Sequence, residues 1–237
     1  MDIRFFRTHS KLVEFIWPPL ISEEILRALI KVQYYLEKEY GEGIKEIRKG
    51  YHTLSLRLQE DISEQDCQDL IEEFKRIPAE PQDEDAAKTW TIPVLYGGEF
   101  GKDLDQLAKI HKLKAEDVVQ MHSENVYTLH FYGFLPGFMY LGGLNPHLYT
   151  KRKERPERLI PKGTVAIGGQ QTGIYPQESP GGWYAIGSCP IPLFDIQKNP
   201  PVFARVGDLI RFKPIDLDTY RQIKEQVQQG NYKLKND

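Results

Sequence analysis

The middle of the chain concentrates glycine and aromatic residues in three segments, GFLPGF (133–138), GGQQTGIYP (168–176) and ESPGGW (178–183). Eleven of the 19 glycines of the chain fall between Gly133 and Gly187. Glycine weakens helices and strands, but it permits positive φ angles and close approach of backbones. This density therefore predicts loops shaped around a ligand or a partner, although a barrel with many tight turns would need several of the same glycines.

The C-terminal part of the chain alternates short apolar runs with turn residues, which predicts a closed or half-closed β-structure. Two short helices are expected within 103–122, and the second begins AEDVVQ (115–120). That sequence is acidic where a DNA-recognition helix needs hydrogen-bond donors, so an ordinary helical hairpin is favoured over DNA binding. The expected strands are 90–96, 126–132, 164–167, 183–186, 191–194 and 208–212.

The first eighty residues predict a separate, compact α/β unit. Ser22 can cap a helix whose apolar residues repeat at helical spacing, and a second helix is expected to begin after Ser63. Short strands are expected at 3–6, 12–17, 44–47 and 54–58. This order is similar to that of a ferredoxin-like domain, and the proline-bearing acidic stretch that follows predicts a linker. The predicted organisation is domain 1–80, linker 81–88 and domain 89–237.

The composition excludes several classes of protein. Of the 237 residues, 27% are charged, and the net charge of −3 does not recommend nucleic acid as a partner. No apolar run approaches the roughly 20 residues that span a bilayer, and the N-terminus lacks the pattern of a signal peptide. Two isolated cysteines indicate neither a metal site nor a disulfide framework and fit a reducing compartment. We therefore expect a cytoplasmic protein with no membrane segment and no metal.

Several polar residues are candidates for chemistry, each with a structural alternative. His122 stands at the end of a predicted helix, where an imidazole can reach a loop cleft, although a lone histidine is more often structural. Glu178 and Ser179 can serve as a base or ligand, or can cap backbone donors in their turn. Gln171, Thr172 and Tyr175, by contrast, suit a small amide-like or carboxylate ligand better than a phosphate.

Other patterns limit the possible activity. The basic stretch 151–158 can face an anionic substrate or an acidic partner, or can be a solvated loop. The chain has no phosphate-binding P-loop, no dinucleotide fingerprint and no Gly-x-Ser-x-Gly elbow. A self-contained hydrolase is therefore not expected.

Taken in order, five motifs closely resemble the allophanate hydrolase subunit 1 family. They are GFLPGFMYLGGL (133–144), IPKGTVAI (160–167), QTGIYP (171–176), ESPGGW (178–183) and GDLIRF (207–212). The resemblance implies an α+β protein in which an N-terminal ferredoxin-like α/β domain is followed by a C-terminal cyclophilin-like β-barrel.

The same resemblance implies a function. The family includes the B subunit of an enzyme complex that uses ATP to open 5-oxoproline to glutamate, together with C-like and A-like subunits as its partners. Which chain of the complex holds ATP is not evident from this sequence. The family also includes a non-enzymatic inhibitor of a sporulation histidine kinase, and relatives fused into the carboxyltransferase part of urea carboxylase. A 5-oxoprolinase subunit that is inactive alone is the preferred hypothesis, and a kinase inhibitor or a component acting on urea or allophanate are the alternatives.

The resemblance also assigns residues. His122 and Glu178 are expected to handle protons, and the expected substrate-binding residues are Gln171, Thr172, Tyr175, Ser179 and Arg152. The residues expected to shape the loops are Gly133, Pro136, Gly137, Gly181, Gly182 and Trp183. Members of the family commonly carry two Pro-Arg pairs in the basic stretch. Here Arg152 keeps its place, but the second pair is Pro156-Glu157, which puts contacts at that position in doubt.

Overall fold

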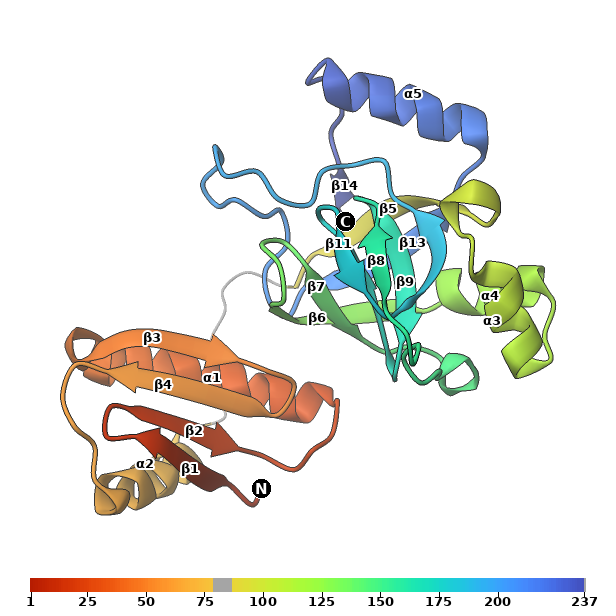
Figure 1. Ribbon diagram of the computed structural model, residues 1–237. Helices are drawn as coiled ribbons and strands as arrows, with labels where there is room; N and C mark the ends of the chain where they lie inside the picture. The colour runs from red at the N-terminus through yellow and green to blue at the C-terminus, as the bar shows by residue number, and fades with distance from the viewer. Residues whose placement is uncertain (79–86, 237) are drawn as a thin grey trace. The chain divides into compact units, whose positions relative to one another are not determined.

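The computed structural model describes residues 1–78 and 87–236, and its chain forms two compact units, Met1–Ala86 and Ala87–Asp237 (Figure 1). Most of the predicted linker, 81–88, falls outside the described residues.

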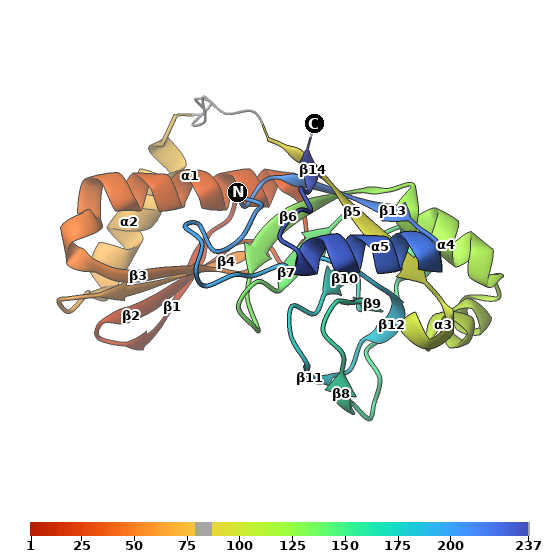
Figure 2. The ribbon, with the colours of Figure 1, turned by 90° about the horizontal axis from the view of Figure 1, so that it is seen from above.

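The first unit is a four-stranded antiparallel sheet with two helices. Its elements are β1 (Arg4–His9), β2 (Leu12–Ile16), α1 (Glu23–Tyr40), η1 (Gly41–Gly43), β3 (Ile44–Lys49), β4 (Thr53–Leu58) and α2 (Glu64–Arg76). The strands lie in the order β1-β2-β4-β3, and Figure 2 shows α1 and α2 on the same side of this sheet. All the helices and strands predicted for this part of the chain are present.

The caps and the core explain why this unit folds. The Ser22 side chain accepts a hydrogen bond from the Ile25 amide, and Ser63 forms a capping box with Asp66. The apolar faces of both helices pack on one face of the sheet, where Phe15 and Phe74 meet edge to face at 5.0 Å. The order of elements, β-β-α-β-β-α, differs from the β-α-β-β-α-β order of ferredoxin-like folds because the edge strand β1 comes first. The ferredoxin-like expectation is therefore not confirmed.

The second unit is a closed barrel. Within the described residues seven strands follow one another as β12-β9-β10-β7-β6-β13-β5, and β5 pairs with β12 to close the ring. All these neighbours are antiparallel except β5 and β13, and β14 (Lys235–Asn236) adds to β5. The barrel strands are β5 (Thr89–Tyr96), β6 (Val126–Tyr132), β7 (Met139–Gly142), β9 (Thr164–Gly168), β10 (Gln171–Ile174), β12 (Tyr184–Ser188) and β13 (Leu209–Pro214).

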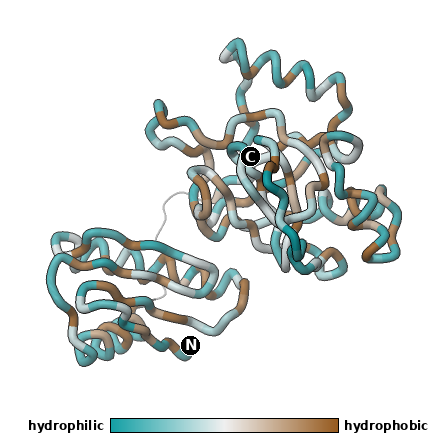
Figure 3. The backbone as a smooth tube through the Cα atoms, in the orientation of Figure 1, coloured by the Kyte–Doolittle hydropathy of each residue, from teal (hydrophilic) through white to brown (hydrophobic). Residues whose placement is uncertain are grey.

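Further elements surround the barrel. The helices α3 (Leu104–His111) and α4 (Ala115–Ser123) contribute Leu107 and Val118 to its core. A short ribbon of β8 (Glu157–Ile160) and β11 (Ser179–Gly181) lies beside β9 in Figures 1 and 2. The remaining elements are η2 (Gly98–Phe100), η3 (Pro146–Leu148) and α5 (Leu217–Gln228). Along α5, short brown stretches interrupt the teal in Figure 3, as in a helix that buries only one side.

The expectation of a closed β-structure is confirmed, but individual strands differ from the prediction. The predicted strand 191–194 is wrong: this segment is irregular, although Ile191 and Leu193 are buried in the barrel core. Pro190 and Pro192 lack the amide hydrogen that a strand ladder requires, so the alternation of apolar residues arises without a strand. No strand was predicted for β7, β8, β10, β11 or β14, each of which has four residues or fewer. Among the described residues no helix is both long enough and apolar enough to cross a membrane.

Close backbone packing at Gly101 provides a test of the barrel. A Cβ atom at this position would overlap the carbonyl oxygen of Ile186 on β12. Because backbone cannot move aside as a side chain can, Gly101→Ala is expected to lower the free energy of unfolding by about 1–3 kcal/mol. Gly182→Ala is the matched control, because a Cβ there meets nothing closer than 3.6 Å. Denaturant unfolding of both variants measures the difference, and equal stability would contradict the packing.

Candidate functional site

The candidate residues on β10 are divided between two faces of the barrel. Successive residues of a strand point to opposite faces. Thr172 and Ile174 point into the barrel, where Ile174 belongs to its core. Gln171 and Gly173 therefore point outward, and a Cβ at Gly173 would meet the ring of Phe138. The polar run that the sequence presents as one group thus serves two separate environments.

Inside the barrel, His122 is enclosed in a complete hydrogen-bond chain. Its side chain is 0% exposed, and its ring stacks on Phe212 with centroids 4.6 Å apart. The Thr172 hydroxyl donates to the carbonyl oxygen of Ala166 at 3.0 Å, so it can only accept from His122 Nε2 at 2.9 Å. Nδ1 then carries no proton and accepts from the Tyr96 hydroxyl at 2.8 Å. Every polar atom of the ring is therefore satisfied by the neutral imidazole.

Burial also keeps the imidazole neutral. Desolvation lowers the pKa of His122 to about 3 from its ordinary value of 6.5. The structure places this side chain inside the barrel rather than at a loop cleft, and Thr172 lies there with it. The proton-handling role of His122 and the substrate-binding role of Thr172 stay predictions, and their surroundings are those of a structural pair.

Outside the barrel, six aromatic rings form a continuous cluster, which we call the aromatic face. Phe131 stacks on Tyr140 with centroids 4.4 Å apart. Phe138 lies 5.2 Å from Tyr175 and 5.5 Å from Trp183, in both cases edge to face. The members are Phe131, Phe134, Phe138, Tyr140, Tyr175 and Trp183.

The aromatic face also carries a cation. The Arg152 guanidinium carbon lies 5.7 Å from the centre of the Trp183 ring, within the range of a cation–π contact. Burial raises the pKa of Tyr175 to about 12, and the charge of Arg152 acts in the opposite direction. Arg152 is exposed, so its guanidinium is accessible to an anion. The structure thus brings together Arg152, Tyr175 and Trp183, whose expected roles stay predictions.

The 133–138 loop borders the aromatic face with a tight turn. Leu135 donates its amide hydrogen to Gly133, and Phe138 donates to Leu135. Gly137 has φ +82°, a conformation that glycine adopts without strain. Phe134 has φ 62°, and its ring is 60% exposed at the tip, next to the exposed Pro136. A bulky residue held at positive φ and displayed to solvent is uncommon, and such strain is concentrated at functional sites.

Glycines allow the aromatic rings to pack directly on backbone. A Cβ at Gly168 would collide with the Trp183 ring, and one at Gly181 with the Tyr175 hydroxyl. Gly182 has more space, and its carbonyl accepts the Lys153 amide hydrogen at 2.8 Å. The many glycines in this part of the sequence therefore allow both the turns and the close packing of the aromatic face.

The remaining pair of candidates lies at the edge of this region. Glu178 is exposed in the turn after Tyr175. Ser179 begins β11, is 7% exposed and donates to the carbonyl oxygen of Pro180 at 3.2 Å. Glu178 is therefore accessible for chemistry, whereas the hydroxyl of Ser179 is directed to its own turn.

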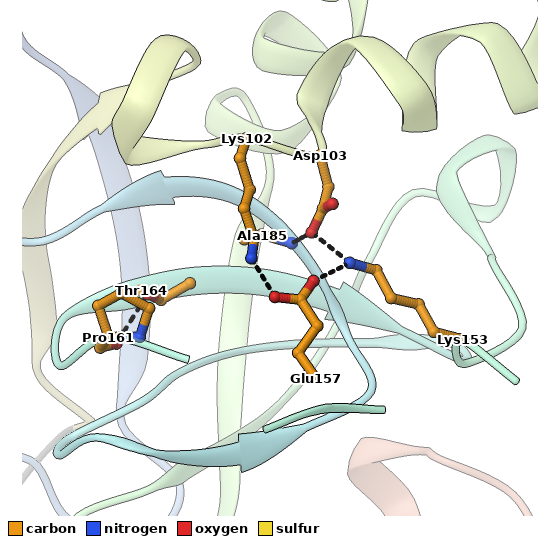
Figure 4. A network of polar contacts seen from close by, with 7 residues as sticks. All are labelled: Lys102, Asp103, Lys153, Glu157, Pro161, Thr164 and Ala185. Atoms are coloured by element: carbon orange, nitrogen blue, oxygen red, sulfur yellow. Dashed lines mark hydrogen bonds and ion pairs between the residues drawn. The ribbon is translucent and has the colours of Figure 1, made fainter. Parts of the chain in front are cut away.

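A buried ion network holds the segment that bears Arg152 (Figure 4). The Lys153 ammonium bonds Asp103 Oδ2 at 2.7 Å and also contacts Glu157, which pairs with Lys102. Asp103 accepts in addition the Ala185 amide hydrogen at 2.7 Å. Burial by itself would raise the pKa of Glu157, but its hydrogen bonds with Lys102 and Lys153 outweigh burial and lower it.

The chain just before Arg152 is anchored by backbone hydrogen bonds. Thr150 and Gly169 exchange two hydrogen bonds of 3.0 and 2.6 Å, which attach the segment to the end of β9. Arg152 therefore lies on a short span fixed at Thr150 on one side and at Lys153 on the other. Sequence reasoning missed this network, because Asp103 lies 50 positions before Lys153 and no local pattern connects them.

Gln171 has an unusual environment on the aromatic face. Its side-chain oxygen Oε1 is buried and has no hydrogen-bond partner among the residues that the structure describes. Gln171 pairs with Gly168, over which Trp183 packs, so the amide lies close to the Arg152–Trp183 contact.

The neutral state of His122 predicts a pH dependence of stability. Because its pKa is lower in the folded chain than in the unfolded chain, its stabilising contribution is present above about pH 6.5 and is lost as the pH falls toward 3. His122→Gln retains a donor and an acceptor but cannot be protonated. Between pH 7 and pH 4, wild type is therefore expected to lose more unfolding free energy than His122→Gln, measured by urea denaturation. Parallel pH profiles would contradict burial of a neutral imidazole.

The ion network predicts that two lysine substitutions lower the free energy of unfolding by different amounts. Lys153→Met leaves Asp103 and Glu157 without their shared ammonium, whose side chain is only 15% exposed, and is expected to cost about 3 kcal/mol of unfolding free energy. Lys102→Met is the control, since that side chain is 47% exposed and is expected to cost less than about 1 kcal/mol. NMR of the Arg152 Nε–H and Trp183 indole N–H signals reports whether the cation–π contact persists. Equal effects of the two variants would contradict the proposed anchoring.

Comparison with known proteins shows the family to which the chain belongs. Residues 1–204 match the family described as the carboxyltransferase domain, subdomain C and D. The chain is 39% identical to the B subunit of 5-oxoprolinase from Haemophilus influenzae over 196 residues, which cover 82% of this chain and 90% of that protein. It is 46% identical to the B subunit of 5-oxoprolinase from Bacillus subtilis over 135 residues, 57% of this chain and 56% of that protein. The latter match thus spans little more than half of its relative.

A solved structure shares the fold at lower identity. The crystal structure of Kluyveromyces lactis urea carboxylase superposes with a TM-score of 0.83 at 17% identity, covering 99% of this chain and 24% of that chain. One family description matches most of the chain, and a curated relative is 39% identical to it. The resemblance drawn from the motifs is therefore confirmed. The chain belongs to the family described as the carboxyltransferase domain, subdomain C and D.

Proposed function

We propose that this chain is the B subunit of an ATP-dependent 5-oxoprolinase and that the aromatic face binds the substrate. The observation that carries the proposal is the exposed Arg152 guanidinium, held over Trp183 beside an amide and a tyrosine. The substrate, 5-oxoproline, combines a carboxylate with a small lactam ring. A guanidinium binds a carboxylate through two parallel hydrogen bonds, and aromatic rings pack against the ring carbons.

The residues of this chain have separate roles in the proposed reaction. Arg152 binds the substrate carboxylate, and Trp183 and Tyr140 form the apolar wall. ATP supplies the driving force by phosphorylating the lactam carbonyl oxygen, after which water attacks the activated carbon and the C–N bond of the ring breaks. Glu178 is the proposed acceptor of a proton from that water, and its exposure supports this role. The products are glutamate, ADP and phosphate.

Other chains complete the enzyme in this proposal. Two relatives are named as the B subunit of 5-oxoprolinase, which supports a role inside a complex, and the proposed partners are C-like and A-like subunits of the same enzyme. The chain lacks a phosphate-binding P-loop, so a partner is proposed to hold the nucleotide and the chain to be inactive alone. The composition supports a cytoplasmic location.

Finer descriptions of the fold belong to the same proposal. The first unit has the strand order of a ferredoxin-like sheet if β1 is counted last, which supports a permuted ferredoxin-like domain. The closed barrel with peripheral helices supports a cyclophilin-like assignment for the second unit.

The function is tested on the tagged full chain isolated with its partner chains. ADP release that 5-oxoproline stimulates, together with formation of glutamate, is the expected result. If an intact complex released ADP without regard to 5-oxoproline, the proposal would fail, and inhibition of a histidine kinase and carboxylation of urea would be tested next.

Arg152 provides the test at the level of the residue. Arg152→Gln removes the cation, and the KM for 5-oxoproline is expected to rise by about 10-fold or more, since hydrogen bonds to charged groups contribute about 1.5–3 kcal/mol. Arg155→Gln makes the same change of charge three positions away, at an exposed side chain, and is expected to leave KM unchanged. An unaltered KM in an active Arg152→Gln complex would remove Arg152 from the binding site.

A further inference from the structure

The buried side-chain oxygen of Gln171 requires an explanation. A buried acceptor that lacks a donor is costly, and native structures contain few of them. Gln171 Oε1 is such an atom among the described residues. The residue as a whole is only half-buried, so its amide could have turned toward water, but the structure keeps one end of it in the protein.

The residues paired with Gln171 on the neighbouring strands offer it no side chain to bond to. Its partner on β9 is Gly168, and the pairing of Thr172 with Leu141 places Gln171 opposite Gly142 on β7. Gly173, two positions along β10, faces the same side. Three glycines therefore lie beside Gln171 on this face, and the rings of Trp183 and Phe138 pack against Gly168 and Gly173.

The chemistry of a carboxamide indicates what fits beside it. A glutamine side chain presents a carbonyl acceptor and an N–H donor on one edge. A five-membered lactam is a cis amide, which also presents its N–H and C=O on one edge. The two edges complement each other through two hydrogen bonds, whichever way round the glutamine amide is assigned.

We propose that Gln171 recognises the amide edge of the substrate and thereby selects a lactam over the corresponding lactone; this inference rests on the proposed function. Gln171 Oε1 accepts from the lactam N–H, and Nε2 donates to the lactam carbonyl oxygen. Arg152, which lies over the Trp183 ring, binds the carboxylate, so the ligand is held at two points. Gln171 is the specificity-determining residue of the pair, because a lactone keeps the carboxylate and loses only the N–H.

The lactone isostere provides a direct test. In 5-oxotetrahydrofuran-2-carboxylate a ring oxygen replaces the N–H, so two acceptors face each other at Gln171. A site with a buried hydrogen-bonding group discriminates against a ligand that leaves this group unpaired. We expect the complex of the full chain, without ATP, to bind 5-oxoproline at least about tenfold more tightly than the lactone, measured by calorimetry.

Matched variants assign this preference to one side chain. Gln171→Met keeps the length of the side chain but neither donates nor accepts strongly, and the ratio of the two affinities is expected to fall toward one. Gln170→Met changes the exposed neighbouring residue in the same way and is expected to preserve the ratio. A folded Gln171→Met complex that keeps the preference for the lactam would overturn the inference, as would a wild-type complex that binds both ligands equally or neither.

The inference and the proposed function can fail separately. An active 5-oxoprolinase complex without preference for the lactam would overturn the role of Gln171 and leave the function intact. Conversely, a complex that binds the lactam selectively through Gln171, but shows no turnover of 5-oxoproline, would overturn the proposed function and leave the recognition of a cyclic amide. NMR of the Gln171 side-chain amide signals during titration with each ligand distinguishes direct contact from an indirect effect.

Discussion

The strict alternation of residues along β10, in a sheet that closes on itself, governs the rest of the barrel. A closed sheet has an inside that must be apolar or fully hydrogen-bonded and an outside that can meet a ligand. Thr172 faces the inside, where its hydroxyl joins His122 to the backbone of β9. Gln171 faces the outside. A shift of one residue in register would exchange these two side chains and leave an imidazole unsatisfied in the core.

The outer face depends in turn on the position of Trp183. Its ring packs on Gly168, where only the absence of a Cβ gives it room, and the Arg152 guanidinium lies over the ring. Arg152 is held there by a span whose ends are fixed through Thr150 and Lys153. A cation placed by rigid neighbours needs little reorganisation to bind an anion, which is the condition for selective recognition of a carboxylate.

The candidate chemistry of the chain is confined to the second unit. No candidate residue from the sequence falls in the first unit, whose core is a conventional helix-covered sheet. The aromatic face has a guanidinium, an amide, an accessible carboxylate and an exposed Phe134, and the sequence has neither a P-loop nor a dinucleotide fingerprint. This combination is the basis for the proposal that the chain works as one subunit of a complex, and two relatives are named as subunits.

The sequence by itself determined the division into an α/β unit and a β-rich unit, the helix caps and the membership of the family. These properties depend on local patterns: apolar spacing, capping residues such as Ser22 and Ser63, and long motifs in fixed order. Tyr175 and Trp183 could also be selected, because two of the motifs carry them, and Arg152 because it keeps its place in the basic stretch.

Only the tertiary structure determined which candidates share an environment. Thr172 and Gln171 are adjacent in sequence, yet the pleat of one strand sends them to opposite faces of the barrel. His122 could be identified as a polar residue at the end of a helix, but its enclosure depends on Tyr96, Thr172 and Phe212, which come from distant parts of the chain. The Asp103–Lys153 contact has the same origin as the Gln171 oxygen that lacks a hydrogen-bond partner within 1–78 and 87–236. Both follow from long-range packing, which no local sequence pattern encodes.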